Sequence, residues 1–252
     1  MTDPQLTILV VGSTGSIGRH VVGEALRSGH RVRALVRSAD RAAALDPGAQ
    51  AVVGDLTDAS TLTNAVADVD AVIFTHGDNS NAAAVNYGAV RSVLNALAGR
   101  PVRIALMTTI GVTALRDSSK WKRRGERLVR ASGNEYTIVR PGWFDMNDDD
   151  QLAIAPRQGD SHQTGSPADG VIARSQIARV LVDSLTNPDA AHKTFELVAA
   201  RGLEQDDLRP VFAALPADPD GALDGPGDVA NLALEDEPAS VRADLDRTRT
   251  QH

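Results

Sequence analysis

Short apolar runs alternate with helical patterns along the first 200 residues of the chain. The runs are nearly continuous in Val, Ile, Leu and Ala, which is typical of strands buried on both faces of a parallel sheet. We expect six such strands, within residues 6–12, 31–37, 49–55, 70–75, 102–109 and 135–141. The patterns between them predict helices at 17–28, 59–67, 82–98 and 119–131. The sequence therefore predicts an α/β fold with a doubly wound parallel sheet.

The pattern becomes less regular after residue 141. Residues 144–170 predict a loop with at most one short strand, and they precede an apolar segment at 170–173, a helix at 175–186 and a last strand at 193–199. We expect the elements from about residue 143 to cover the substrate, within one domain of residues 1–200. Residues 201–252 are expected to form a C-terminal extension, in which short helices flank a Pro-, Gly- and Asp-rich segment at 215–228.

The C-terminal extension carries the whole net charge of −7. Residues 1–200 hold 21 acidic and 21 basic side chains, whereas residues 201–252 hold 12 acidic and 5 basic ones. An acidic excess argues against nucleic-acid binding as the main task. We interpret the extension as a solvated acidic segment, with a docking tail as the alternative.

Composition narrows the chemistry further. The chain has no cysteine, which excludes disulfides, thiolate metal sites and a cysteine nucleophile and suits a reducing cytoplasm. The first residues, "MTDPQLTILVVG", have no basic region before their apolar run, so we expect no signal peptide. No apolar run approaches the roughly 20 residues of a membrane helix. We therefore predict a cytoplasmic protein that does not bind a membrane. We also expect no metal site, since "NDDD" at 147–150 is expected to be solvated.

A glycine-rich loop joins the first predicted strand to the first predicted helix. Its glycines, spaced G-x-x-G-x-x-G, are Gly12, Gly15 and Gly18. In such a loop the first glycine permits a tight turn, the second lets the backbone approach a pyrophosphate, and the third lets helix and strand pack closely. Free N–H groups and the helix dipole favour phosphates there. Hydroxyl donors are available at Ser13, Thr14 and Ser16. The sequence predicts a Rossmann-type dinucleotide site.

The end of the second predicted strand indicates which dinucleotide binds. An acidic residue about 20 positions after the glycine motif would bind the ribose 2′-OH of NAD. Here that place, 19 residues after Gly18, is occupied by Arg37, and Ser38 and Arg41 follow it. A guanidinium group suits the 2′-phosphate of NADP because several donors meet a dianion. We predict NADP (NADPH) as the cofactor, the alternative being that Arg37 is only a surface residue at a strand end.

Taken together, these segments resemble the atypical short-chain dehydrogenase/reductases, and more narrowly their NAD(P)H-binding group of NmrA-like proteins and biliverdin-IXβ/flavin reductases. The resemblance extends over about residues 6–200. It rests on the motifs "VVGSTGSIGRHVV", "LVRS", "VVGDLTD", "VNYGAVRSVLNAL", "MTTIGV", "KWKRRGERLVRASGNEYTIVRPGWF" and "KTFELV". The implied fold is the Rossmann-type sheet with a small C-terminal portion that covers the substrate.

The resemblance also implies roles for residues that follow the strands. The segment Gly12 to Ile17 would wrap the pyrophosphate, and Arg37 would contact the 2′-phosphate. The positions implied to lie beside the adenine, the ribose and the diphosphate are Asp55, Leu56, Thr75, His76 and Gly77. Those implied to lie near the nicotinamide and the reacting atoms are Thr108, Thr109, Lys122, Pro141, Trp143 and Phe144. All are at carboxyl ends of strands or on the helix that follows, where an open parallel sheet binds its ligands.

The chain departs from the family at the catalytic pair. Many short-chain dehydrogenases use Tyr-x-x-x-Lys on one helix, where the lysine lowers the tyrosine pKa so that the hydroxyl transfers a proton. The lysine matching this pattern is Lys122, but residue 118 is a serine. Tyr87 lies on an earlier helix and Tyr136 in a strand, so neither is a replacement. The departure argues against Tyr-dependent ketone reduction.

Three candidates for catalysis remain: Thr109, Lys122 and His76. Lys122 either binds the nicotinamide ribose or is a solvated lysine among the arginines of its helix. His76 either donates a proton or is a hydrogen-bonded structural residue. The aromatic pair Trp143–Phe144 either contacts a flat substrate or fills the core.

The sequence as a whole favours an NADPH-dependent oxidoreductase that transfers hydride to a small conjugated acceptor such as a quinone, flavin or enone. The protein would supply orientation and electrostatics, while the cofactor supplies the redox chemistry. The alternative is a non-catalytic, NADP-sensing regulatory protein of NmrA-like type, which the missing tyrosine keeps open. An epimerase has less support because its acid/base pair would be incomplete.

Overall fold

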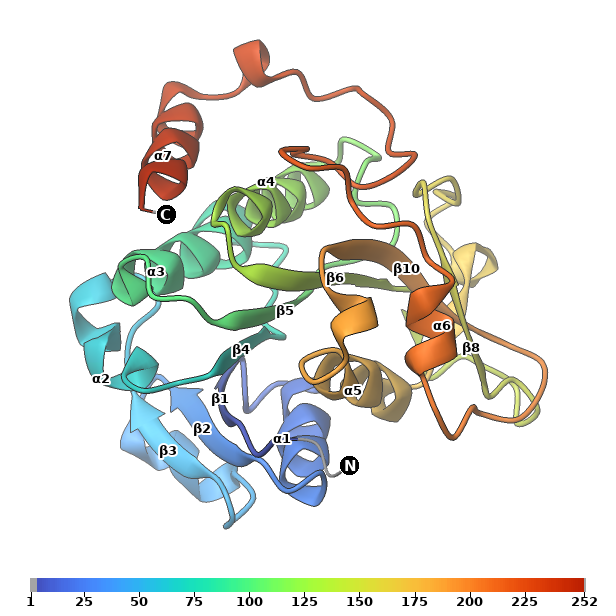
Figure 1. The fold of residues 1–252 in the computed structure, drawn as a ribbon, viewed down its shortest axis with the longest axis horizontal. Coiled ribbons are helices and arrows are strands. Elements are labelled where there is room, and N and C mark those ends of the chain that lie inside the picture. The colour runs from blue at the N-terminus through green and yellow to red at the C-terminus, as the bar shows by residue number, and fades with distance from the viewer. Residues whose placement is uncertain (1–3, 252) are drawn as a thin grey trace.

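The computed structural model describes residues 4–251, in which an eight-stranded sheet has helices on both faces (Figure 1). The strand order is β3-β2-β1-β4-β5-β6-β10-β8, and all neighbours are parallel except β8, which runs antiparallel to β10. The strands of this sheet are β1 (Thr7–Val11), β2 (Arg31–Val36), β3 (Gln50–Val53), β4 (Ala71–Phe74), β5 (Arg103–Met107), β6 (Glu135–Pro141), β8 (Ala153–Arg157) and β10 (Lys193–Ala200). The predicted Rossmann-type α/β fold is confirmed.

The central strands owe their continuous apolar sequences to burial on both faces. Every residue of β1 and of β4 is buried, so neither face needs polar side chains. At the sheet edge, β3 is mostly exposed and covers only four of the seven residues expected for it. The predicted strand positions are therefore right, and the lengths differ most at β3 and β5, each three residues shorter than expected.

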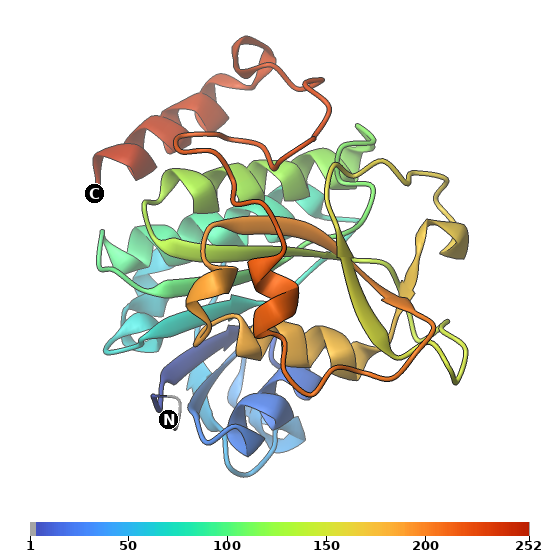
Figure 2. The same cartoon turned by 45° about the vertical axis from the view of Figure 1, so that its right-hand side comes forward.

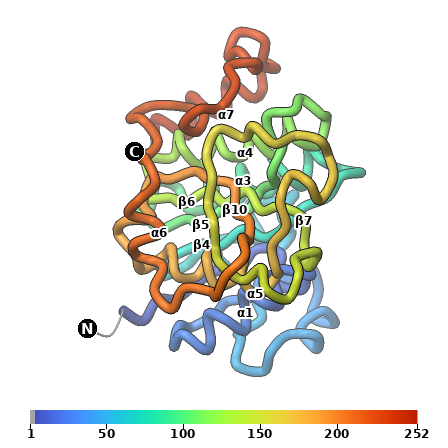
Figure 3. The backbone as a smooth tube through the Cα atoms, turned by 90° about the vertical axis from the view of Figure 1, so that its right-hand side faces the viewer, coloured from blue at the N-terminus to red at the C-terminus, as the bar shows by residue number. Residues whose placement is uncertain are grey.

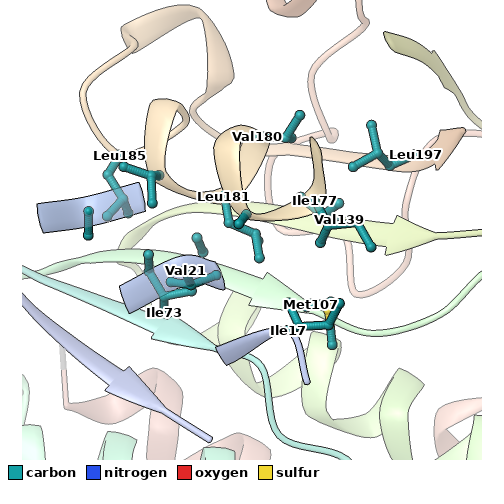
Figure 4. Packing of buried hydrophobic residues seen from close by; sticks show 14 of the residues in the cluster. Ile17, Val21, Ile73, Met107, Val139, Ile177, Val180, Leu181, Leu185 and Leu197 are labelled. Atoms are coloured by element: carbon teal, nitrogen blue, oxygen red, sulfur yellow. The ribbon is translucent and has the colours of Figure 1, made fainter. Parts of the chain in front are cut away.

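Two helical layers enclose the sheet (Figures 1 and 2). One contains α1 (Gly18–Arg27) and α5 (Arg174–Asp183), which pack against each other and against the sheet. Figure 4 shows this packing, with Val21 and Leu181 among apolar side chains of the sheet such as Ile73. The other layer contains α2 (Thr63–Val66), α3 (Gly88–Leu97) and α4 (Asp117–Ala131). No helix in residues 4–251 is long and apolar enough to cross a membrane.

Two of the predicted helices contain tighter or wider turns. The helix expected at 59–67 begins as a 3₁₀ turn, Ala59–Leu62, before α2. The helix expected at 82–98 begins with a π-helical turn, Ala83–Tyr87, before α3. Helix α1 ends as predicted, because Gly29 adopts a φ of +82° that suits a helix terminus. Other short turns lie at Ala39–Ala44, Pro167–Asp169, Pro188–Ala190 and Leu234–Asp236.

The segment after residue 141 contains three short strands, and only β8 lies wholly within residues 144–170, where the sequence predicted a loop with at most one short strand. Strands β7 (Trp143–Phe144) and β9 (Val171–Ile172) pair with each other, and β8 pairs with the free edge of β10. These strands depend on partners distant in sequence, so no local period reveals them. Pro156 is tolerated within β8 because that strand lies at the edge of the sheet.

The C-terminal extension contradicts the prediction that it is solvated. It contains α6 (Arg209–Ala213) and α7 (Ala239–Thr250), and between them the chain passes β10 and α4 (Figures 1 and 3). Its buried acidic residues include Asp218, Glu237 and Asp244. The carboxylates pair with arginines of α4, of α3 and of β6. The acidic excess is therefore balanced by basic side chains about 100 residues earlier in the chain.

Candidate functional site

A cleft formed by two adjoining depressions lies at the carboxyl ends of β1, β4, β5 and β6. Their volumes are about 480 and 430 Å³. Both are lined by Ser16, Thr75, His76, Gly77 and Asp78. The cleft opens beside β1, where strand order reverses from β1-β2-β3 to β4-β5-β6. Such a switch point is where doubly wound sheets bind dinucleotides.

Each of the three loop glycines has a different structural role. Gly12 has a φ of +87°, and a Cβ there would lie 2.8 Å from the backbone nitrogen of His76. A Cβ on Gly18 would overlap the carbonyl oxygen of Gly12. A Cβ on Gly15 would meet only that same oxygen, at 3.1 Å, so this residue faces open space. Gly12 and Gly18 thus shape the turn, while Gly15 leaves backbone accessible at the start of α1, as a pyrophosphate requires.

The first depression, of about 430 Å³, has basic and acidic groups at its outer end. Arg37 and Arg41 line it, are exposed, and make no side-chain hydrogen bond or ion pair among the described residues. Asp55 also lines it, and its pKa is lowered because the backbone N–H and the hydroxyl of Thr57 donate to its carboxylate. Both bonds reach Oδ1, which leaves Oδ2 as an acceptor. The predicted adenine-side residues Asp55 and Leu56 and the predicted phosphate ligand Arg37 therefore share one depression.

The second depression, of about 480 Å³, is apolar on one side and polar on the other. Its apolar lining includes Trp143 and Phe144, with Trp143 38% exposed. Its polar lining includes Thr108, Thr109 and Lys122. The ammonium group of Lys122 makes no hydrogen bond or ion pair to any described residue, so it is available to a ligand. Lys122 is half-buried, and burial lowers its pKa while the charge of Glu126 opposes that change.

His76 lies at the junction of the two depressions but is poorly suited to act as an acid. Burial, with a smaller contribution from the nearby charge of Lys122, lowers the pKa of His76 to about 4. Its imidazole is therefore neutral near pH 7. Its Nδ1 atom is buried without a hydrogen-bond partner in the described part of the chain. His76 therefore lies in the cleft as expected, but at neutral pH its imidazole does not carry the extra proton that easy proton donation needs.

Neither tyrosine of the chain lines the cleft. The hydroxyl of Tyr87 donates to Asp244 at 2.8 Å, and that of Tyr136 donates to Asp218 at 2.9 Å. Burial and these carboxylates raise the pKa of both tyrosines. Ser118, four residues before Lys122, donates to Oδ1 of Asn79 at 2.8 Å. Thr109 remains a hydroxyl candidate beside the second depression. Its hydroxyl donates to the carbonyl oxygen of Ile110 at 3.1 Å, whereas that of Thr108 donates to the buried Glu126.

The structure brings together all the predicted site residues except Ser13. The hydroxyl of Ser13 is buried and donates to the carbonyl oxygen of Leu35 at 2.8 Å. It thus joins the loop to β2 and cannot bind phosphate as expected. The residues lining the two depressions are, among those predicted, Gly12, Thr14, Gly15, Ser16, Ile17, Arg37, Asp55, Leu56, Thr75, His76, Thr108, Thr109, Lys122, Pro141, Trp143 and Phe144.

Sequence reasoning missed the loop after His76. Asp78, Asn79 and Asn81 line the cleft, and the loop is fixed by Asn86 of the π-helical turn. The side chain of Asn86 accepts from the backbone N–H of Asp78 and donates to its carbonyl oxygen, both at 2.9 Å. A polar run directly after a buried strand was the available signal. Among the described residues no cluster of acidic or histidine side chains could hold a metal ion.

Comparison with known proteins agrees with this geometry. A family model described as NAD(P)H-binding matches residues 12–188. The chain is 30% identical over 212 residues to the photosystem II assembly factor Ycf39 of Synechocystis sp., covering 78% of this chain and 63% of that protein. It is 28% identical over 213 residues to the NAD(P)H azoreductase of Xenophilus azovorans, covering 82% and 73%. The chain spans less than two thirds of the length of the first curated relatives that it matches.

A solved structure shares the fold. ChuY, an anaerobillin reductase from Escherichia coli O157:H7, superimposes with a TM-score of 0.61 over 76% of this chain and 96% of that one. The two sequences are 23% identical, so the likeness concerns the fold. The matched family region, residues 12–188, contains every residue that lines the cleft.

Proposed function

We propose that this chain, which belongs to the NAD(P)H-binding family, is an NADPH-dependent oxidoreductase that transfers hydride to a small conjugated acceptor such as a quinone, flavin or enone. One observation carries the choice of acceptor. The second depression combines an aromatic side, at Trp143 and Phe144, with the unpaired cation of Lys122, while its histidine is neutral and no tyrosine lines it.

The residues of the cleft fit a phosphorylated dinucleotide. The open side of Gly15 and the first turn of α1 would meet the pyrophosphate, because the free N–H groups of a helix start favour phosphate oxygens. The exposed guanidinium groups of Arg37 and Arg41 would bind a 2′-phosphate. Bound NADPH supplies the hydride. We infer a preference for NADPH from these two unpaired arginines.

The acceptor end of the cleft orients a flat molecule more readily than it protonates one. Trp143 and Phe144 offer apolar rings, and Lys122 offers a positive charge to an oxygen that gains electron density. Reducing an ordinary ketone produces an alkoxide, which needs a positioned acid, and general acid catalysis supplies about 10²–10⁴-fold. A quinone or flavin spreads the new charge over a conjugated system. The hydroxyl of Thr109, or solvent, is then a sufficient donor.

A panel of acceptors tests the proposal. Purified protein with NADPH is expected to reduce quinones or flavins at least about 100-fold faster than simple aliphatic ketones, since only the ketones need the missing acid. Trp143→Ala should raise KM for the acceptor while the dissociation constant of NADPH stays unchanged. As a matched control, Met146→Ala removes another exposed apolar side chain, one that does not line the cleft. Efficient ketone turnover would contradict the proposal.

The alternative function is an NADP-sensing protein that carries out no reduction. It is favoured by one observation, that both tyrosines are bound to carboxylates of the C-terminal extension. Tight NADPH binding without consumption, with every acceptor of the panel, would support the sensor. The two functions share the same dinucleotide site and differ only at the acceptor end of the cleft.

A further inference from the structure

A buried charge cluster lies directly behind the acceptor end of the cleft, and Glu126 is at its centre. The Glu126 carboxylate accepts hydrogen bonds from the Thr108 hydroxyl at 2.7 Å and from Arg140 at 2.7 and 3.1 Å. Arg130 donates to it at 3.4 Å. Burial alone would raise the pKa of Glu126, but the two guanidinium groups and the threonine lower it. Glu126 is therefore an anion that no solvent reaches.

The C-terminal extension completes this cluster. Arg140 also makes two hydrogen bonds to Asp228, at 2.6 and 2.7 Å, and Arg130 donates to Asp218 at 3.0 Å. Both aspartates belong to the extension and are buried within the assembled fold. Three carboxylates, counting Glu126, thus surround two guanidinium groups. The cluster has an excess of one negative charge on the side of α4 that leads to the cleft.

Lys122 is the cation nearest to that excess on the cleft side. It precedes Glu126 by one helical turn, so both side chains lie on the same side of α4. In the cleft, Lys122 lies near the neutral His76, and Asp78 lines the same depression. Burial of this kind can lower a lysine pKa by several units unless an opposite charge is near. Glu126 is the negative charge that opposes deprotonation of Lys122.

Other charged groups lie around α4. None of them lines the cleft. Arg140 has Asp160 and Glu196 on its other side, and burial raises the pKa of both acids, to about 7 for Glu196. Of the remaining charged side chains on α4, Arg123, Arg124 and Arg127 pair with Asp224 and Glu237 of the extension, while Asp117 and Lys120 form no ion pair among the described residues. On the neighbouring α3, Arg91 pairs with Asp244.

We propose that Glu126, held through Arg140 by Asp228 of the extension, is a positioning residue that keeps the Lys122 amine protonated and directed into the cleft. The acidic extension is in this way a part of the ligand site, although it does not line it. Glu126 also fixes the Thr108 hydroxyl, whereas the Thr109 hydroxyl at that strand end donates to the carbonyl oxygen of Ile110. The inference rests on the proposed function in one respect, namely that Lys122 contacts the bound ligand.

The charge state of Lys122 can be measured without cofactor or acceptor. Trace acylation with acetic anhydride over a pH series, read by mass spectrometry, gives the pH midpoint at which each amine becomes reactive. The chain has three lysines, so the labelled positions are easily assigned, and Lys120 serves as an internal reference. The full chain is compared with three variants, Glu126→Gln, Asp228→Asn and, as matched control, Glu237→Gln. Glu237 is equally buried and paired with arginines of α4, but it contacts neither Glu126 nor Arg140.

We expect the Lys122 midpoint of the unmodified chain to lie above about pH 8, and to fall by about one unit in Glu126→Gln and in Asp228→Asn, since each removes one negative charge from the cluster. Glu237→Gln should leave it unchanged. An unmodified midpoint below about pH 7, unchanged midpoints in both variants, or an equal shift in Glu237→Gln would overturn the proposal. If Asp228→Asn does not fold, Glu126→Gln and the unmodified chain decide it. Because NADPH oxidation is not part of this measurement, a failure of the protein to oxidise NADPH would be a separate result that contradicts only the proposed function.

Discussion

At the nucleotide end of the cleft, Arg37 and Arg41 are exposed, and within residues 4–251 no carboxylate or other acceptor binds their guanidinium groups. On α4, by contrast, Arg123, Arg127 and Arg130 are buried, and each forms an ion pair with the C-terminal extension. The two sets of arginines have the same chemistry and differ in what surrounds them. Unpaired cations beside a glycine-rich loop indicate an anionic ligand, whereas paired and buried ones indicate architecture.

This difference follows from the cost of removing charges from water. A buried guanidinium group loses several kcal/mol of hydration, which carboxylates and carbonyl oxygens must offset through well-placed hydrogen bonds. Arg127 has four such bonds, to Asp224, Glu237 and the carbonyl oxygen of Leu232. An exposed guanidinium group keeps its water and can exchange it for a phosphate. The first kind of arginine should therefore control stability and the second kind binding.

The largest effect is expected from removing one of the buried arginines. Arg127→Ala leaves Glu237 and Asp224 with fewer donors, and breaking a buried ion pair from one side costs about 3–5 kcal/mol. The free energy of unfolding, measured with urea, should fall by that amount. Arg41→Ala is the matched control and should change stability by less than about 0.5 kcal/mol, because its side chain has no partner. Equal losses in the two variants would mean that the arginines do not differ in this way.

The next effect concerns the loop on which the cleft depends. Gly15→Val places a branched side chain on the open side of the loop, where a pyrophosphate would approach. NADPH binding, measured by fluorescence, should weaken at least about 100-fold, while circular dichroism shows a folded protein.

Gly18→Ala provides the contrasting variant. Its Cβ would overlap the carbonyl oxygen of Gly12, so stability and binding should fall together. Unchanged NADPH affinity in Gly15→Val would show that the glycines serve packing alone.

The sequence was sufficient for the parts of the fold that local patterns determine. Buried parallel strands and amphipathic helices have periods that can be read directly, so β1, β4 and α4 were placed correctly. Motif spacing placed Arg37 and Gly15 in one cleft, because the carboxyl ends of parallel strands meet at one edge of a sheet. The roles of individual side chains were harder to predict from the sequence. Ser13 stands in the motif, yet its hydroxyl bonds to Leu35 on β2.

The extension shows why the remainder could not be predicted. The acidic composition of the extension predicted a solvated segment, because a local excess of acidic residues does not reveal which basic residues pair with it. Asp228 accepts hydrogen bonds from Arg140, 88 residues earlier in the sequence, and Asp244 accepts one from Tyr87, 157 residues earlier. Nothing in the local sequence marks Glu126 as buried, and only the fold shows that it lies between Thr108 and Arg140. Pairings of this kind depend on topology, not on local pattern.

A smaller effect tests the exposed arginines directly. Because one charge-assisted contact contributes roughly 1.5–3 kcal/mol, NADPH should bind at least about tenfold more tightly than NADH to the unmodified chain. Arg37→Asp should remove or invert this preference, since a carboxylate repels a 2′-phosphate and suits a ribose hydroxyl. Titrations of both cofactors into both proteins measure it. Arg27→Asp, at an exposed position on α1 outside the cleft, is the control. Equal affinities in the unmodified chain would refute the assignment to NADP.

The smallest effect concerns His76, which lines the same depression as Arg37 but is more buried. Its pKa is about 4 in the folded chain, against about 6.5 when unfolded. Between these values the unfolded chain binds more protons, so stability rises with pH in this window. The contribution of neutral His76 is complete above about pH 6.5 and is lost as the pH falls toward 4.

Urea unfolding at pH 7 and at pH 5 therefore distinguishes a buried, neutral His76 from a solvated one. The unmodified chain should lose more stability between the two pH values than His76→Gln, which has no imidazole to protonate on unfolding. His162→Gln, at an exposed loop histidine, is the control and should behave as the unmodified chain does. The same His76→Gln protein should oxidise NADPH with a nearly unchanged rate between pH 6 and 8, since a neutral imidazole contributes no proton there. A rate that falls with a midpoint near pH 6.5 in the unmodified chain, and not in the variant, would return His76 to the role of catalytic acid.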